Sequence, residues 1–295
     1  MLTAQQYSPN LHSTKGLLVA LVLSLPLGIT AGTVLRSVST REVPQAFREP
    51  ALVRPELEPQ IVEIPLHPVR FRPAGSFSLQ DTVVDAPLVT LASRKSLLIM
   101  RHQVSAAEYE RCVAARACKA ANRGAAAADF PAVKVSWEDA STYAAWLSRE
   151  TGKTYRLPAD EEWIAAAGSR MPENAVIAGS AKNPAARWLA EYEAEANRDP
   201  AEIEPKPLGT FGVNEYGVAD LAGNVWEWTD SCFIRATVSD DGLSYQTTTV
   251  NCGVRVVEGL HRAYLPNFVR DARGGACSTG NPPSNLGFRL VRDEP

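Results

Sequence analysis

The sequence predicts a loop-rich α+β domain, and three observations support this fold class. The chain of 295 residues contains 19 Gly and 21 Pro, which interrupt regular elements too often for a helix bundle or a Rossmann sheet. Helical and strand-like patterns occur in separate stretches, and no internal repeat is evident. A chain of this length can bury a real core. We therefore expect one main domain with short elements and many loops.

The first 36 residues are expected to form an export signal or a membrane anchor. An apolar run without charged residues extends from Gly16 to Gly32, after Lys15. Its length is near the lower limit of the roughly 17–25 residues that span a bilayer, and it also suits a secretory signal. Polar segments on both sides argue against a buried core helix. We expect a periplasmic protein. Retention of this segment as an anchor in the inner membrane is slightly favoured over its cleavage as a signal.

A linker and the first strands are expected next. Residues 37–60 are rich in Pro and charge and lack either structural period, which predicts an extended linker before a domain of residues 61–295. The stretch from Val69 to Leu79 is strand-like, with Gly75 at a turn.

Three helices are expected in the first half of the domain. The apolar spacing of Val104, Tyr109 and Val113 predicts a short helix from Ser105 to Ala115. A clearer helix begins at Ser136, where Asp139 completes a capping box, and ends at Gly152. A third helix follows Arg156-Leu-Pro and stops near Gly168. Beyond it, Gly, Pro and Asn recur too often for long regular elements.

The five cysteines fit an oxidising compartment. We pair Cys112 with Cys118 and Cys232 with Cys252 as a hypothesis, because four cysteines allow three connectivities, and Cys277 is left over. The chain has no Cys-x-x-Cys pair and only four His, which argues against a zinc site.

Composition and motifs exclude two further classes. The net charge of -3 and the scattered Lys and Arg residues argue against nucleic-acid binding. The sequence also contains no Gly-x-Ser-x-Gly elbow, so a serine hydrolase is not supported.

Four segments, in this order, resemble the sulfatase-modifying-factor family, to which the formylglycine-generating enzymes belong. They are Phe130–Ala140, Tyr155–Trp163, Asn214–Trp228 and Asn285–Arg289. The resemblance implies the loop-rich variant of the C-type-lectin fold as in formylglycine-generating enzymes. The family usually has Thr where Ala159 stands, so Asp160 is expected to cap the third helix instead.

The segment Asn214–Trp228 is the candidate for a structural calcium site. Its oxygen-rich turn suits calcium, which takes 6–8 oxygen ligands. By resemblance, the ligands are the side chains of Asp220 and Glu227 and the carbonyls of Leu221, Gly223 and Val225. The alternative is a metal-free turn in which Asp220 caps backbone amides, while Trp226 and Trp228 belong to the core. Asn197 is a weaker candidate for a second calcium site that the family has.

The family's enzymes oxidise a sulfatase cysteine with a copper ion held by two cysteines. The first follows a His-Arg-Ser-Tyr-like stretch, which here is His261–Tyr264, and the second lies five residues later. The corresponding positions are Leu265 and Arg270. Because a cuprous ion prefers soft thiolates, neither residue replaces the missing ligand, and we expect no copper.

Other chemistry rests on weak catalytic candidates, namely Cys277, His261 and Arg270. Cys277 is either a nucleophile or, more commonly for a lone thiol, an inert one. The remaining residues either line a pocket for an anionic ligand or serve structure, with His261 and Arg262 as a hydrogen-bonded pair and Arg270 in an ion-pair cluster. The pocket would comprise His261, Arg262, Tyr264, Arg270 and Arg273.

Iron chemistry also finds little support. Members of the wider family that make sulfur-containing histidine derivatives bind iron through a histidine cluster. This chain has four His, one of which precedes the apolar run, so a three-histidine site is not expected.

Two functions remain. The first is an accessory or maturation module that binds a periplasmic protein or peptide, supported by a resemblance of Asn251–Val256 and Arg270–Cys277 to the branch associated with copper nitrite reductases. The second is an oxidoreductase or transferase with altered chemistry that uses Cys277 or an external metal. The missing cysteine pair favours the first.

Overall fold

The computed structural model describes residues 53–92, 95–121, 127–171, 193, 197, 204–271 and 285–294. The chain divides into two compact units, Met1–Phe47 and Arg48–Pro295, and every described residue belongs to the second. The predicted export segment and the first part of the predicted linker lie outside the described residues.

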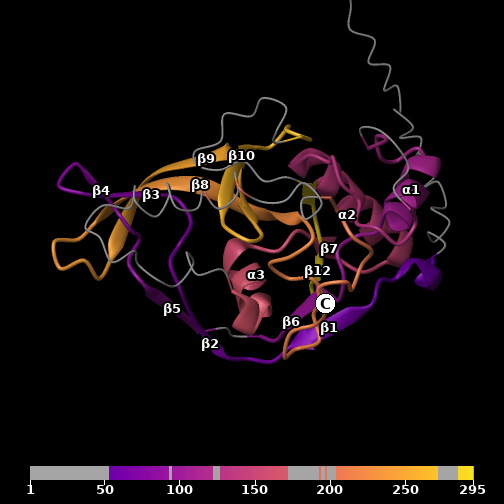
Figure 1. The fold of residues 1–295 in the computed structure, drawn as a ribbon, viewed down its shortest axis with the longest axis horizontal. Helices are drawn as coiled ribbons and strands as arrows, with labels where there is room; N and C mark the ends of the chain where they lie inside the picture. The colour runs from indigo at the N-terminus through magenta and orange to yellow at the C-terminus, as the bar shows by residue number, and fades with distance from the viewer. Residues whose placement is uncertain are drawn as a thin grey trace, which may run out of the picture. The chain divides into compact units, whose positions relative to one another are not determined.

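Three small sheets organise the domain (Figure 1). One has the order β1-β6-β12-β7, formed by Ile61–Ile64, Leu97–Met100, Val291–Arg292 and Tyr155–Arg156. The largest has the order β10-β9-β8-β3-β4, with β11 also on β8. Its strands are Ala263–Pro266, Tyr245–Glu258, Trp226–Val238, Ser76–Leu79, Thr82–Val84 and Leu286–Gly287. The third pairs β2, Pro68–Phe71, with β5, Val89–Ala92.

The predicted strand-like stretch is present as β2 and β3, with Gly75 between them at φ +144°. A Cβ atom at Gly75 would lie 2.6 Å from the carbonyl oxygen of Ile234 on β8, so only glycine permits this close approach.

The prediction of no long elements after the third helix is wrong. β8 and β9 are 13 and 14 residues long and form a hairpin that extends away from α1 and α2 (Figure 1). Its turn contains Gly242 at φ +71°, after Asp240 and Asp241. An Asp-Gly pair before the β-branched run Thr247–Val250 is a hairpin signal that outweighs the scattered glycines.

The two best-marked helices form as predicted. Helix α1 spans Ala106–Ala114 and α2 spans Trp137–Thr151. Each starts with a reciprocal capping box, Ser105 with Glu108 and Ser136 with Asp139, which satisfies backbone donors that a helix leaves free. α2 ends at Gly152 in the left-handed conformation.

Helix α3, Asp160–Ala167, starts at the predicted place, but the predicted cap is wrong. The Glu162 carboxylate accepts from the Ala159 N–H at 2.7 Å, which satisfies the helix start. Asp160 is thereby free to form an ion pair with Arg262. A short 3₁₀ turn, η2, Gly168–Arg170, follows.

The core is divided between the two sides of the domain. One cluster joins α1 and α2 to β8, β10 and β11 and contains Trp226, Trp228, Leu265 and Phe288. A second packs α3, through Trp163, against the sheet of β1 and β6. Both tryptophans of the predicted turn are therefore core residues, at 2% and 0% exposure.

Both predicted disulfides, Cys112–Cys118 and Cys232–Cys252, are confirmed. The first closes the end of α1, and the second joins β8 to β9.

The last eight residues of the predicted linker belong to the domain. A 3₁₀ turn, η1, covers Pro55–Leu57, and Leu57 packs against the α1–α2 core. The Arg54 N–H donates to the Glu150 carbonyl at 2.7 Å. The apolar Leu57 and this hydrogen bond outweigh the local Pro-rich composition. Among the described residues, no helix has the length and apolarity to cross a membrane.

Candidate functional site

The residue at the first copper-ligand position, Leu265, is fully buried. It lies on β10 opposite Arg255 of β9, and Arg255 in turn lies opposite Cys232 of β8. Because directly paired residues share one face of a sheet, these three form a row across it. Leu265 contributes to the α1–α2 core, where its side chain offers no donor atom to a metal.

The neighbouring surface is closed by the first turn of α2. The Arg255 guanidinium lies 3.8 Å above the Trp137 ring, a cation–π contact, and pairs with Asp230 at 3.1 Å. Trp137 also packs against the α1–α2 core. The Trp137 indole and the Arg255 guanidinium therefore lie beside the position that the resemblance assigns to the first copper ligand.

The residue at the second position, Arg270, is anchored to the same helix turn. Its Nη2 lies 2.6 Å from Asp139 Oδ1, and its Nη1 donates to the Ala120 carbonyl at 2.9 Å. The other carboxylate oxygen of Asp139 accepts from Ser136 in the capping box. Arg273 lies outside the described residues, so a cluster of Arg270 with Asp271 and Arg273 stays a prediction beside this pair. Burial of Asp139 at the helix start explains why the guanidinium turns toward α2.

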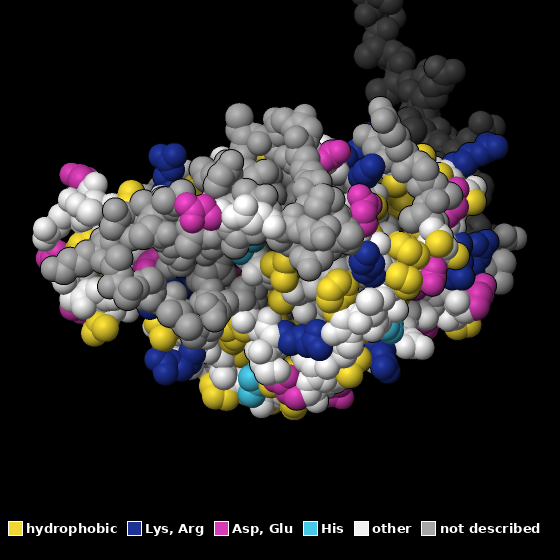
Figure 2. Space-filling model, viewed as in Figure 1, with side chains coloured by type: hydrophobic (Ala, Val, Ile, Leu, Met, Phe, Trp, Pro, Cys, Tyr) yellow, Lys and Arg dark blue, Asp and Glu magenta, His cyan; other side chains and the backbone are white. Residues whose placement is uncertain are grey.

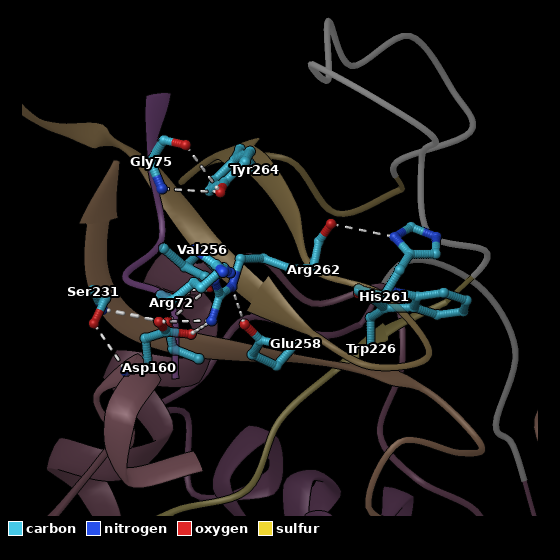
Figure 3. A network of polar contacts seen from close by, with 11 residues as sticks. Arg72, Gly75, Asp160, Trp226, Ser231, Val256, Glu258, His261, Arg262 and Tyr264 are labelled. Atoms are coloured by element: carbon cyan, nitrogen blue, oxygen red, sulfur yellow. Dashed lines mark hydrogen bonds and ion pairs between the residues drawn. The ribbon is translucent and has the colours of Figure 1, made fainter. Parts of the chain in front are cut away.

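Arg262, a residue of the predicted anion pocket, is the centre of a buried ion cluster (Figure 3). The Arg262 guanidinium, 7% exposed, lies 3.0 Å from Asp160 and donates to Glu258 as well. Its Nη1 donates to the Arg72 carbonyl at 2.8 Å. The nearby Tyr264 hydroxyl accepts from the Gly75 N–H at 2.9 Å. These contacts join α3, β9 and the β2–β3 connection, so Arg262 and Tyr264 serve the fold.

Burial and the neighbouring charges of this cluster shift the pKa values of Glu258 and Arg262. Burial raises the pKa of Glu258 well above its usual 4.5, while Arg262 lowers it and Asp160 raises it. The two carboxylates hold the pKa of Arg262 above its usual range, against the effect of burial.

His261, a weak catalytic candidate, packs against Trp226, and its catalytic role stays a prediction. The two rings stand edge to face with centroids 5.1 Å apart, and Trp226 Nε1 donates to the His261 carbonyl at 2.9 Å (Figure 3). The His261 Nδ1 lies 3.3 Å from the Arg262 carbonyl, and the residue is 8% exposed. The structural alternative for His261 and Arg262 therefore describes both residues.

The Glu227 carboxylate, a predicted calcium ligand, accepts hydrogen bonds from three protein side chains. Its Oε1 accepts from Gln103 at 2.8 Å and Arg289 Nη2 at 2.7 Å. Its Oε2 accepts from Trp163 Nε1 at 2.8 Å and Arg289 Nε at 2.6 Å. A carboxylate has about four acceptor positions, so these protein donors fill them. Arg289 is thus the ion-pair partner of Glu227, and a calcium ion bound by this carboxylate stays a prediction.

The Asp220 side chain is also committed to protein donors. Its two oxygens accept the N–H groups of Gly209 and Phe211, which is the predicted alternative of a carboxylate that caps backbone amides. The turn is nevertheless unusual, because Asp220, Ala222 and Asn224 all have positive φ. A calcium ion held by the carbonyls of Leu221, Gly223 and Val225 stays a prediction.

Two weaker candidates stay untested. Cys277 lies outside the described residues. Asn197 is described only as a turn residue whose N–H donates to the Glu193 carbonyl at 3.1 Å, and the second calcium site stays a prediction.

The comparison with protein families decides the relationship. Residues 57–294 match the Sulfatase-modifying factor enzyme 1-like domain, which accounts for most of the chain. The chain belongs to this family. The resemblance carried by the four sequence segments is thereby confirmed.

The sulfatase-modifying-factor relatives include active and inactive proteins. The chain is 34% identical over 189 residues to the formylglycine-generating enzyme of Mycobacterium tuberculosis, covering 56% of this chain and 58% of the relative. It is 27% identical over 173 residues to that of Streptomyces coelicolor, covering 56% and 53%. It is 31% identical over 170 residues to the inactive C-alpha-formylglycine-generating enzyme 2 of Bos taurus, covering 54% of each. The chain thus spans about half the length of these relatives.

The fold also agrees with a solved structure of similar architecture. The superposition on PvdO from Pseudomonas aeruginosa covers 84% of this chain and 100% of PvdO, with a TM-score of 0.50 and 23% identity. At this identity the likeness concerns the fold alone, and it confirms the predicted loop-rich α+β architecture of the family.

Sequence reasoning about this family member missed the partners of its buried charges. Arg289 and Asp160 lie inside two of the recognised segments, but no local pattern indicates that they pair with Glu227 and Arg262. Gln103 and Glu258 carry no sequence signal of their own, because the tertiary fold brings Gln103 to Glu227, and Glu258 to the side of Asp160 and Arg262.

Proposed function

We propose that this chain is a sulfatase-modifying-factor-family protein without the copper-dependent cysteine oxidation, and that it acts as an accessory or maturation factor. The observation that carries the proposal is the pair of residues at the copper-ligand positions. Leu265 is fully buried in the core, and Arg270 forms an ion pair with Asp139. A cuprous ion prefers thiolate ligands, and neither a hydrocarbon nor a guanidinium provides one.

The relatives support this reading. The chain is similar to proteins named as inactive formylglycine-generating enzymes in cattle and, at 34% identity over 169 residues, in mouse. Loss of the oxidase chemistry on a retained fold therefore has a parallel among them.

We further propose that the protein works outside the cytoplasm on a periplasmic protein or peptide, with a periplasmic reductase as the first partner to test. Two disulfides in one domain are typical of exported proteins, because cytosolic thiols are kept reduced. The surface favours a protein ligand over a nucleic acid. On the face shown in Figure 2, acidic and basic side chains of the described residues are mixed rather than gathered by sign.

The test combines elemental analysis with an oxidation assay on the purified full chain. We expect no stoichiometric copper and no conversion of a cysteine peptide that the Mycobacterium tuberculosis enzyme, as matched control, oxidises under the same conditions. Stoichiometric copper together with peptide oxidation would overturn the proposal. The same analysis counts calcium, and one ion per chain would support the predicted calcium site with main-chain ligands.

The alternative is a redox or transfer enzyme with altered chemistry. It is favoured by a similarity of 34% over 113 residues to the hercynine oxygenase of Mycolicibacterium smegmatis, which covers 35% of this chain and 22% of that protein. Oxygen consumption by the purified chain, lost on substitution of Cys277 by Ser, would support this alternative. Cys112 and Cys118 provide no such thiol because they are paired.

A further inference from the structure

Strand β9 has a long edge that no described strand covers. On one side it pairs with β8 from Tyr245 to Glu258. On the other side it pairs with β10 only at residues 254–257, and the Asn267 N–H adds one bond to the Gly253 carbonyl at 3.0 Å. Within the described part of the chain, the edge from Tyr245 to Gly253 is therefore open.

The composition of this edge is that of a strand that accepts another strand. Every residue from Gln246 to Gly253 is exposed, and the stretch Tyr245–Val254 contains no charged residue and no proline. Proteins usually protect a free edge with Lys, Pro or a bulge. Lys and Pro are absent here, whereas the β8–β9 register shifts beside Thr248 and beside Cys252, so the regular part of the edge is centred on residues 249–251. The disulfide between Cys232 and Cys252 also fixes the strand to β8, which reduces the entropy lost on pairing.

Exposed apolar side chains lie at both ends and in the middle of the same edge. The three most exposed large hydrophobic residues of the described chain are Leu243 at 75%, Phe268 at 68% and Val250 at 61%. Leu243 lies in the hairpin turn before β9, Val250 is near the middle of the edge, and Phe268 follows Asn267 beside Gly253.

We propose that this edge pairs antiparallel with the same edge of a second copy, around a twofold axis near Thr249. A symmetric dimer requires a surface that complements itself, and this edge does so end to end. In the proposed register Tyr245 faces the partner subunit's Gly253. Leu243 then reaches the partner subunit's Phe268, and the same contact recurs at the other end.

The proposed register also avoids electrostatic repulsion between the two paired strands. Val250 faces the partner subunit's Thr248, and Thr249 faces its own counterpart, so no like charges lie opposite each other. The identical apolar pair at both ends favours a second copy over an unrelated peptide, which would have to match Leu243 and Phe268 separately. The inference is independent of the proposed function, because it involves neither copper-ligand position.

Charge substitutions on the axis test the dimer. We expect the purified full chain to be a dimer by light scattering and analytical ultracentrifugation. Thr249→Lys or Thr249→Glu should weaken dimerisation about tenfold or more, because like charges then face each other across the axis. A mixture of the two variants should restore the dimer, a recovery that misfolded protein would not show. Val83→Lys is the matched control, because Val83 is 45% exposed on β4, the opposite edge of the same sheet.

Two outcomes would overturn the proposal. One is a wild-type chain that stays monomeric at the highest concentration tested. This outcome overturns the dimer even if hydrogen exchange shows that a strand of another protein protects the edge. The other is a dimer that both charge variants leave intact.

Discussion

At the scale of single residues, the Arg289–Glu227 ion pair is fully buried in the described part of the domain. Arg289 is 0% exposed, and besides Glu227 it donates to the carbonyls of Met100, Arg101 and Ala219. Removing one partner of such a pair costs more than the pair itself contributes, because it leaves a charge without water or counter-ion.

Arg289→Met is therefore expected to lower the free energy of unfolding by about 3–5 kcal/mol in urea denaturation. Arg156→Met is the matched control, since Arg156 pairs with Glu162 and Asp293 at 39% exposure, where loss of a pair costs about 1 kcal/mol or less. Adding Glu227→Gln to Arg289→Met should recover part of the loss. Equal losses for Arg289→Met and Arg156→Met would contradict this account of Glu227.

At the scale of elements, one disulfide links the two strands of the β8–β9 hairpin and another closes the end of α1. The two disulfides close loops of different length. The cysteines of the hairpin are 20 residues apart, and those near α1 are 6 apart. A disulfide stabilises mainly by restricting the unfolded chain, and the effect grows with the size of the closed loop.

Replacing Cys232 and Cys252 with Ala should cost about 3 kcal/mol, and replacing Cys112 and Cys118 about 2 kcal/mol, by the loop-length estimate. The order of the two losses, measured by thermal and urea unfolding of each double variant, is the prediction. The reverse order would mean that packing around the fully buried Cys112 outweighs loop entropy.

At the scale of the whole molecule, the Arg262 cluster ties elements that are far apart in the chain, and it makes stability depend on pH. Because the pKa of Glu258 is raised in the folded state, that state binds the proton more tightly than the unfolded chain does. The contribution of Glu258 is fully present below about 4.5, its usual pKa, and is lost as the pH rises through the raised value.

Glu258→Gln removes this titration and keeps the size of the side chain. Relative to the wild type, its free energy of unfolding should therefore improve as the pH rises above about 4.5. Glu294→Gln serves as control, because Glu294 is exposed near the end of the described chain. A difference between wild type and Glu258→Gln that does not change with pH would contradict the raised pKa.

Local features of the sequence were enough to predict helices α1 and α2. The four segments spread over the chain indicated the family, and the structure selected the predicted disulfide pairing among three connectivities. The helices depend on residues close together in the chain, such as Ser136 with Asp139. Only the tertiary structure decided that Arg289 pairs with Glu227, 62 residues away. It also decided that Asp160 pairs with Arg262, 102 residues away, instead of capping its helix. These pairings require crossovers in the strand order, and burial decides them because a charge inside the protein must find its partner wherever the sheets place it.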